Sequence, residues 1–386
     1  MKNFLFKIYA FKFFDDLILI YPLYTVMFKS YGMQPWQIAT LLSVWSFTAF
    51  LLEVPSGVWA DKYSRKNILF IGQIIRLFGY LIWLLSPNFT GFLVGFIFWG
   101  VKSALTSGTF QALIYDELKS SGLENDYVKV LGRTKTISFI AIFIASILAS
   151  GTVIFGYQLI LICSLISVFI SACIIFTLPS AQKVESTHEK EYFVLLKHGL
   201  SNVFKNLRVF HLILFLSLAF ALGGALDEYW TLFANEIGLP DYGLGIFLAI
   251  VSICQALASF FAYRLEKKSD NFFYILFSVC GALLCIASYV FSVPALILLI
   301  IFSFVFTIIQ IVFDGKLQSV VDSSVRATVS SVSGFFIEIG VIFVYFCFGF
   351  MAQIIDYRGS FIVFGLLIMI IGCFYLLFNR FNKDMG

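Results

Sequence analysis

The chain has 386 residues, of which 60% are hydrophobic and 12% are charged, with a formal net charge of +4. Soluble domains carry about 25% charged residues, so this composition excludes an ordinary soluble protein and indicates an integral membrane protein.

Apolar stretches of about twenty residues, the length a helix needs to cross roughly 30 Å of hydrocarbon, recur along the chain. They do not show the alternation typical of a β-barrel. We predict an all-α membrane protein with six helices on each side of a polar linker at 179–208. The predicted spans are Leu5 to Phe28, Trp36 to Val58, Ile68 to Ser86, Phe92 to Leu113, Thr136 to Phe155, Gln158 to Leu178, Val209 to Ala234, Tyr242 to Tyr263, Phe272 to Phe291, Pro294 to Phe313, Thr328 to Ala352 and Ser360 to Phe378.

Basic residues gather in the loops that this layout places on one side of the membrane. With the N-terminus inside, Lys29 and Arg358 are the only Lys or Arg residues in predicted outer loops, and Lys12, Arg76 and Lys102 lie within helices. The others fall on the cytoplasmic side, as the positive-inside rule requires. The net positive charge therefore reflects the membrane topology and does not indicate an affinity for nucleic acid. We expect a monomer in a bacterial plasma (inner) membrane, with both termini cytoplasmic.

A short polar segment, Gly57-Val58-Trp59-Ala60-Asp61-Lys62-Tyr63-Ser64-Arg65-Lys66, separates the second and third predicted helices. It resembles the loop between helices 2 and 3 of the major facilitator superfamily, whose pattern is roughly Gly-x-Leu-Ala-Asp-Arg-x-Gly-Arg-Arg/Lys. Trp59 and Ser64 depart from that pattern. The resemblance implies a secondary transporter with twelve transmembrane helices, arranged as an N-terminal half at 1–178, a cytoplasmic linker at 179–208 and a C-terminal half at 209–386.

The same segment predicts a cytoplasmic gate. In the superfamily the corresponding Asp and Arg hold the two halves together when the transporter faces outward, and the resemblance assigns this role to Asp61 and Arg65. A glycine at a helix end permits close backbone approach, so we place Gly57 in the gate together with Glu53. The alternative is that the basic residues only enforce orientation.

A weak internal repeat adds four residues to the predicted gate. Asp116 at the exit of helix 4 and Arg133 before helix 5 are echoed by Asp314 and Arg326 before helix 11. This echo agrees with a transporter built from two structural repeats.

Charged side chains inside helices indicate a central cavity, because each costs at least about 2.5–3.5 kcal/mol on insertion. They are Lys12, Asp15 and Asp16 on helix 1, Lys102 on helix 4, Asp227 and Glu228 on helix 7, and Glu338 on helix 11. In the superfamily, helices 1, 4, 7 and 10 line the central cavity. The alternative for each residue is an ion pair that only joins helices. We expect Arg76 to pair with Glu53 or with a helix 1 carboxylate.

The acids predict proton coupling. The aromatic residues near them predict that the solute is organic and amphiphilic. Tyr21 and Tyr24 follow the helix 1 acids, Trp230 follows Glu228, and Pro22 predicts a bend in helix 1. Asp15 or Asp16 is the best candidate for carrying the proton, with Glu338 second.

Two interpretations of the sequence differ in the direction of transport. Proton-coupled efflux is slightly favoured by the acidic and aromatic cavity, although helix 5 lacks the Gly-Pro stretch of the superfamily's drug exporters. Uptake of an organic acid, with Lys102 as the anion site, is the alternative.

Other function classes fit the sequence poorly. An enzyme would need a reactive cluster, yet His188, His198 and His211 lie in or beside the linker without metal-binding spacing. A channel would need a repeated filter-like loop. We therefore expect no enzymatic activity, no cofactor and no metal, and we expect the partners to be a small-molecule substrate, protons and the lipid bilayer.

The topology is tested by reporter fusions. A fusion at Gln182 should report a cytoplasmic position, because an even number of spans precedes it. Exposure of that fusion outside the cell would show that the predicted helix count is wrong.

Overall fold

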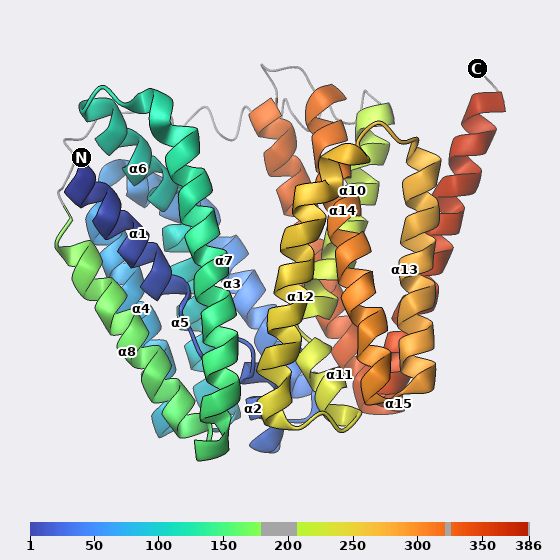
Figure 1. Cartoon of the computed structure of the whole chain (residues 1–386), viewed down its shortest axis with the longest axis horizontal. Coiled ribbons are helices and arrows are strands. Elements are labelled where there is room, and N and C mark those ends of the chain that lie inside the picture. The colour runs from blue at the N-terminus through green and yellow to red at the C-terminus, as the bar shows by residue number, and fades with distance from the viewer. Residues whose placement is uncertain (179–206, 321–325, 385–386) are drawn as a thin grey trace. The chain divides into compact units, whose positions relative to one another are not determined.

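The computed structural model describes residues 1–178, 207–320 and 326–384, and within these ranges it leaves out the side chains of Val54, Asp61, Leu207, Arg208, Arg326, Ala327, Thr328, Ser330, Ser331 and 381–384. The described residues form helices joined by short connections (Figure 1). The α-helices are α1 Lys2–Asp16, α2 Tyr24–Ser30, α3 Pro35–Lys62, α4 Arg65–Leu85, α5 Phe89–Thr106, α6 Thr109–Ser120, α7 Tyr127–Thr152, α8 Tyr157–Phe176, α10 Leu207–Asp227, α11 Trp230–Glu236, α12 Asp241–Phe261, α13 Asp270–Val290, α14 Leu296–Val320 and α15 Arg326–Asp384. Short 3₁₀ turns occur at Glu124–Asp126, Val153–Phe155, Ala262–Arg264 and Val293–Ala295.

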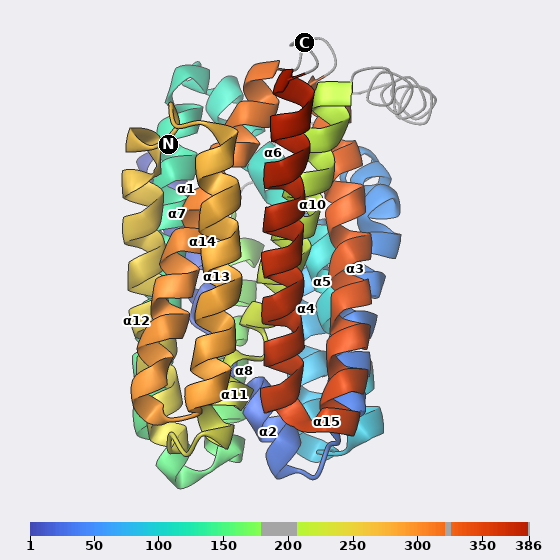
Figure 2. The same cartoon turned by 90° about the vertical axis from the view of Figure 1, so that its right-hand side faces the viewer.

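Ten segments of the described residues are long and apolar enough to cross a membrane, which agrees with the predicted all-α membrane fold. Two features separate this count from the predicted twelve. The first predicted span is divided between α1 and α2, and both pieces are too short to be counted. The last two predicted spans form the single element α15, which is interrupted at Asp356, where φ is 72°. Figure 2 shows the two arms of α15 side by side.

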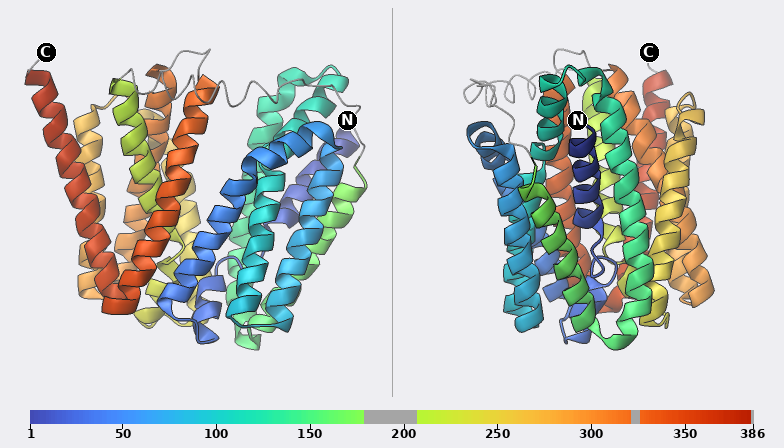
Figure 3. Two further views of the ribbon diagram at one scale, coloured as in Figure 1. Left: turned by 180° about the vertical axis from the view of Figure 1, so that it is seen from behind. Right: turned by 60° about the vertical axis from the view of Figure 1, so that its left-hand side comes forward.

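The chain divides into two compact units. Unit 1 contains Met1–Met33, Thr40–Glu189 and Asp241–Ala249, and unit 2 contains Gln34–Ala39, Lys190–Pro240 and Ile250–Gly386. In unit 1, α1 packs between α7 and α8, and α4 packs on α5 and α8 (Figure 3). In unit 2, α13 packs against both α14 and α15, and α10 packs against α15.

The first predicted helix is broken, which corrects the prediction of one span from Leu5 to Phe28 bent at Pro22. α1 ends at Asp16 and α2 begins at Tyr24. The backbone groups released at the break bind side chains from other helices. Ser167 Oγ donates to the Phe14 carbonyl at 2.9 Å, Arg76 Nη1 donates to the Asp15 carbonyl at 2.8 Å, and the Ile20 amide donates to Ser164 Oγ at 3.0 Å. Pro22 cannot supply the amide that a continuous helix needs. The break therefore begins before the proline, includes it, and is held by α4 and α8.

A second break falls within the predicted span Phe92 to Leu113. α5 ends at Thr106 and α6 begins at Thr109, with Gly108 at a φ of 70° between them. A positive φ strains most residues other than glycine. Gly108 therefore permits this interruption of the helix. The sequence did not predict it, because the segment is largely apolar over its whole length.

Close packing of α3 on α5 depends on Gly100. A Cβ atom added there would lie 2.7 Å from both Thr48 Cβ and the Trp45 carbonyl oxygen. We predict that Gly100→Ala lowers the free energy of unfolding by about 1–3 kcal/mol, the usual cost of overpacking, as measured by thermal unfolding in detergent. Gly132→Ala is the matched control, because a Cβ there meets nothing within 4 Å. Equal stability of the two variants would contradict this close contact.

Candidate functional site

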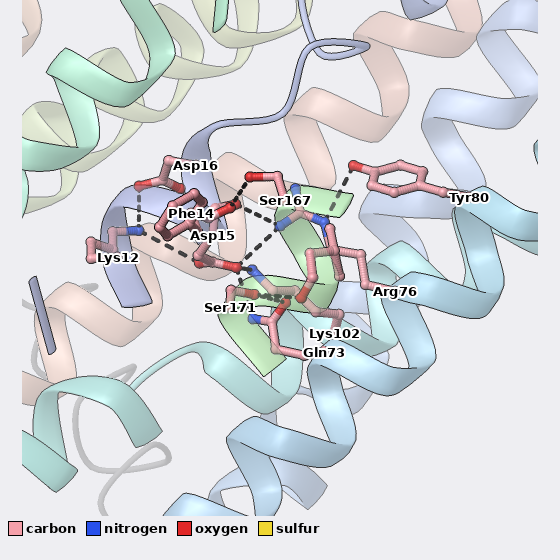
Figure 4. Close-up of polar contacts among 11 residues, drawn as sticks. Lys12, Phe14, Asp15, Asp16, Gln73, Arg76, Tyr80, Lys102, Ser167 and Ser171 are labelled. Carbon is pink, nitrogen blue, oxygen red and sulfur yellow. Dashed lines mark hydrogen bonds and ion pairs between the residues drawn. The ribbon is translucent and has the colours of Figure 1, made fainter. Parts of the chain in front are cut away.

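A buried carboxylate at the end of α1 collects cations from two other helices (Figure 4). Asp15, which is 1% exposed, lies with Oδ1 2.9 Å from Lys102 Nζ on α5 and 3.1 Å from Arg76 Nη1 on α4. Gln73 Nε2 donates to the same oxygen at 2.8 Å. Lys12 Nζ is 3.9 Å from Oδ2. Several donors thus compensate the cost of burying this charge.

Two of the partners of Asp15, Gln73 and Arg76, are held by further contacts. Ser171 on α8 donates to Gln73 Oε1 at 3.1 Å. Arg76 Nε donates to the Tyr80 hydroxyl at 3.2 Å, and its guanidinium carbon lies 5.4 Å from the centre of the Trp99 ring, within cation–π range. The network therefore joins α1, α4, α5 and α8 and fixes the end of α1.

The neighbouring carboxylate, Asp16, has a simpler environment. Its Oδ2 lies 2.8 Å from Lys12 Nζ, one helical turn earlier. The side chains of Asp16 and Lys12 are 19% and 23% exposed, against 2% for Asp15. Adjacent residues thus hold one deeply buried carboxylate with many partners and one carboxylate at an accessible edge.

A cavity of about 600 Å³ opens beside this edge in unit 1. Its walls come from α1, α5, α6, α7 and the break between α5 and α6. Phe110 and Leu131 are its apolar lining residues. The polar lining residues are Lys12, Asp15, Asp16, Lys102, Ser103, Thr106, Ser107, Gln111, Thr134, Lys135 and Ser138. Thr106 Oγ1 is buried and has no hydrogen-bond partner among the described residues.

The cavity carries an excess of positive charge. Three lysines and two aspartates line it, and Arg76 lies directly behind Asp15. Within the ion-pair cluster, Arg76 can be balanced by Asp15 and Lys12 by Asp16. The cluster then holds one cation more than its two carboxylates can balance, and Lys102, which Asp15 shares with Arg76, is the member of that pair that lines the cavity. A surplus cation at a polar cavity is a ready site for an anion.

The predicted proximity of Lys102 to the helix 1 carboxylates is found in the structure, and Arg76 pairs with a helix 1 carboxylate and not with Glu53. The role of these residues in transport stays a prediction. The predicted aromatic residues that follow the helix 1 acids lie elsewhere in unit 1. Tyr24 is buried in a cluster with Phe28, Phe96 and Trp99, and Tyr21 packs on the same cluster; neither lines the cavity.

The predicted gate is only partly within the described side chains. Arg65 forms an ion pair with Asp116 and donates to the Ala112 carbonyl at 2.9 Å, so it ties α4 to α6 within unit 1. The side chains of Asp61 and Arg326 lie outside the described part of the structure. The other gate residues predicted from the sequence, Glu53, Gly57, Arg133 and Asp314, are exposed.

Unit 2 repeats the broken first helix. α10 ends at Asp227, and Glu228 and Tyr229 connect it to α11. Asp227 is exposed, and Glu228 and Glu338 are half-buried. Trp230 is 1% exposed and packs edge-on against Phe302. A break beside an acidic pair is thus shared by α1 and α10.

Sequence reasoning missed the residues that hold the charged cluster. Gln73, Ser171 and Tyr80 are not charged, so the cost of insertion did not single them out. A signal was present for Gln73, because it lies three residues before Arg76 on α4 and so shares its face. The serine and tyrosine carried no comparable signal.

The comparisons decide the family. A family model described as Major Facilitator Superfamily matches residues 6–345. The chain belongs to the Major Facilitator Superfamily. Members of this superfamily are transporters and normally not enzymes. Among curated relatives, the uncharacterized MFS-type transporter YxaM of Bacillus subtilis is 21% identical over 240 residues, a match that covers 61% of this chain and 59% of the relative. An uncharacterized transporter of Buchnera aphidicola is 22% identical, and the match covers 64% of this chain and 68% of the relative.

Solved transporters share the fold. The nucleoside transporter NupG superposes with a TM-score of 0.82 at 16% identity and covers 97% of this chain and 98% of its own. A D-xylose-proton symporter superposes with a TM-score of 0.73 at 12% identity, and the match covers 96% of this chain and 95% of the symporter. These similarities show the fold of a multi-pass membrane transporter. The two curated relatives named above are bacterial.

The surplus charge predicts unequal effects of two substitutions. Asp15→Asn leaves buried cations uncompensated and should lower the free energy of unfolding by about 3–5 kcal/mol. Lys102→Met leaves the cluster neutral and should cost much less. Thermal unfolding of both purified variants in detergent tests this order. The reverse order would show that Lys102 is needed mainly as the structural partner of Asp15.

Proposed function

We propose that this chain is a secondary active transporter that takes up a small, polar organic anion together with a proton, by alternating access. The observation that carries the proposal is the surplus positive charge at the polar cavity of unit 1. Lys102 and Lys135 provide charge for the anion, and Ser103, Ser107 and Gln111 line the same cavity.

The lining favours a polar solute over an amphiphilic one. Hydroxyl and amide groups outnumber the two apolar residues, and Tyr21, Tyr24 and Trp230 are not among the lining residues. Recognition of an amphiphilic drug would instead call for large apolar and aromatic walls. Proton-coupled efflux of such a solute is therefore the weaker proposal.

The membrane potential gives a reason for proton coupling. An interior-negative potential opposes entry of an anion by about 2.3 kcal/mol per charge for each 100 mV. Entry of one proton with each monovalent anion removes this penalty, because no net charge then moves. Efflux of the same anion would be driven by the potential without protons, so coupling favours uptake.

We further propose that the chain crosses the membrane twelve times, with two halves of six crossings. Contacts within each unit support an even number of crossings. In unit 1, Lys7 near the start of α1 donates to the Thr177 carbonyl at the end of α8 at 2.9 Å. In unit 2, His211 on α10 lies 4.5 Å, between ring centres, from Phe378 near the end of α15. Each unit thus begins and ends on one side.

The anion site is tested by thermal stabilisation of the purified protein. We expect gluconate, malate or glucose 6-phosphate to raise the melting temperature, whereas uncharged sorbitol and the hydrophobic cation tetraphenylphosphonium do not. Lys135→Gln should weaken the affinity for the stabilising anion by about fivefold, which corresponds to roughly 1 kcal/mol. This exposed residue lies outside the Asp15 cluster, so its replacement leaves the cluster intact.

Lys129→Gln is the matched control, because Lys129 is exposed on the same helix and does not line the cavity. It should bind the anion as the unmodified protein does. Stabilisation by tetraphenylphosphonium alone, or by none of the three anions, would contradict the proposal.

A further inference from the structure

We propose that the solute is a polyhydroxylated anion, a sugar acid or a sugar phosphate, and that Ser103, Ser107 and Ser138 select it by hydrogen bonding to its hydroxyl groups. This inference rests on the proposed anion transport and adds the class of the solute and the residues that recognise it.

The first argument is that several polar side chains of the cavity wall are not used to hold the fold. Ser103, Ser107 and Ser138 line the cavity, as does Gln111. None of these four side chains forms a hydrogen bond with another described residue. All four are half-buried or exposed. Their donors and acceptors are therefore available to a solute in the cavity.

Other hydroxyl groups of unit 1 behave differently. In apolar helices, serine and threonine commonly donate to a backbone carbonyl, often one turn earlier on their own helix. On α7, Thr136 donates to the Gly132 carbonyl at 3.0 Å. On α8, Ser167 donates to the Phe14 carbonyl of α1 at 2.9 Å. The serines of the cavity wall differ from these residues in keeping their hydroxyl groups free.

The second argument is the position of the free hydroxyl groups relative to the proposed anion-binding charge. Ser103 directly follows Lys102, and Ser107 lies about one turn further along the chain. On α7, Ser138 lies three residues after Lys135, which places both on one face of the helix. Each of the two lysines thus has a free hydroxyl near it. An anionic group bound by the lysines brings the rest of the solute against these hydroxyl groups.

The third argument is the chemistry of the match. A hydroxyl donates one hydrogen bond and accepts others, and a glutamine amide also does both. A carbon chain with hydroxyls along its length can therefore satisfy groups from α5, α6 and α7 at once. An aliphatic acid would remove water from these groups without replacing the lost hydrogen bonds. The cavity volume of about 600 Å³ lies within the range of about 300–1,000 Å³ typical of small-molecule sites.

The solute class is tested with pairs of anions that differ in their hydroxyl groups. Gluconate is compared with hexanoate, which has the same number of carbon atoms and the same carboxylate, and glucose 6-phosphate is compared with hexyl phosphate. Binding to the full-length protein in detergent is measured by isothermal titration calorimetry, after subtraction of a titration into detergent micelles alone.

We expect the tighter of the two polyhydroxylated anions to bind at least about tenfold more tightly than its aliphatic counterpart, because several hydrogen bonds are lost with the hydroxyls. Nonspecific apolar association would give the opposite order. A preference for gluconate assigns a carboxylate as the anionic group, and a preference for glucose 6-phosphate assigns a phosphate; both results support the proposal.

Two variants test the recognising residues. Ser107→Ala and Ser138→Ala should each weaken binding of the tighter polyhydroxylated anion by about threefold to tenfold, the usual effect of one hydrogen bond. The melting temperature without ligand should not change, because neither hydroxyl bonds to another described residue. Thr136→Ala is the matched control, because Thr136 lies on α7 with Ser138 but does not line the cavity. It should bind the anion as the unmodified protein does.

The outcomes separate this inference from the proposed function. Binding of malate, hexanoate or hexyl phosphate as tightly as the better polyhydroxylated anion would overturn the solute class and leave the anion site standing. Full affinity for that anion in both serine variants would overturn the role of these residues. Absence of binding by every anion would overturn the proposed function, and the inference with it.

Discussion

The cost of burying the Asp15 carboxylate constrains much of unit 1. An ion inside a membrane protein requires partners or water, and Asp15 has two close cations and an amide donor. To supply them, α4 and α5 each place a cation against the end of α1. The same Arg76 that binds the carboxylate also binds the carbonyl released where the helix stops. Charge burial and helix termination are therefore satisfied by one side chain.

The broken helix in turn explains why the two aspartates differ. Because α1 stops at Asp16, Asp15 points into the packed helices while Asp16 lies at the cavity with Lys12. The break between α5 and α6 contributes Ser107 to the same cavity. Interrupted helices that meet at a polar cavity are a recurrent way to build transporter sites. In this chain they leave one lysine more than the acids can balance.

The two units treat a similar acidic pair differently. In unit 1, Asp15 and Asp16 are paired with basic residues of the same unit. In unit 2, Asp227 and Glu228 also end the first helix, but the chain contains no Lys, Arg or His between His211 and Arg264, nor between Lys268 and Lys316, nor between Arg326 and Arg358. The basic residues of unit 2 therefore lie near the ends of its predicted spans, whereas Lys12, Arg76 and Lys102 lie within those of unit 1, where we propose that the anion binds.

The sequence predicted the helical class, the family and the meeting of Lys102 with Asp15, because charges inside apolar spans are conspicuous and expensive. It did not predict where helix 1 breaks. The sequence predicted a bend at Pro22. The break is instead set by Arg76, Ser164 and Ser167, whose effect depends on tertiary contacts. The aromatic residues near the acids were predicted to line the cavity. Tyr24 instead packs among other aromatic rings, a distinction that helical spacing alone does not make.

The central claim is that a small organic anion binds at the surplus positive charge of the cavity in unit 1 while the Asp15 cluster stays in place. The most direct measurement is an experimental structure with the stabilising anion bound. The account predicts the anion beside Lys102 and Lys135, with Arg76 and Gln73 still bound to Asp15. An anion bound away from these lysines would contradict it.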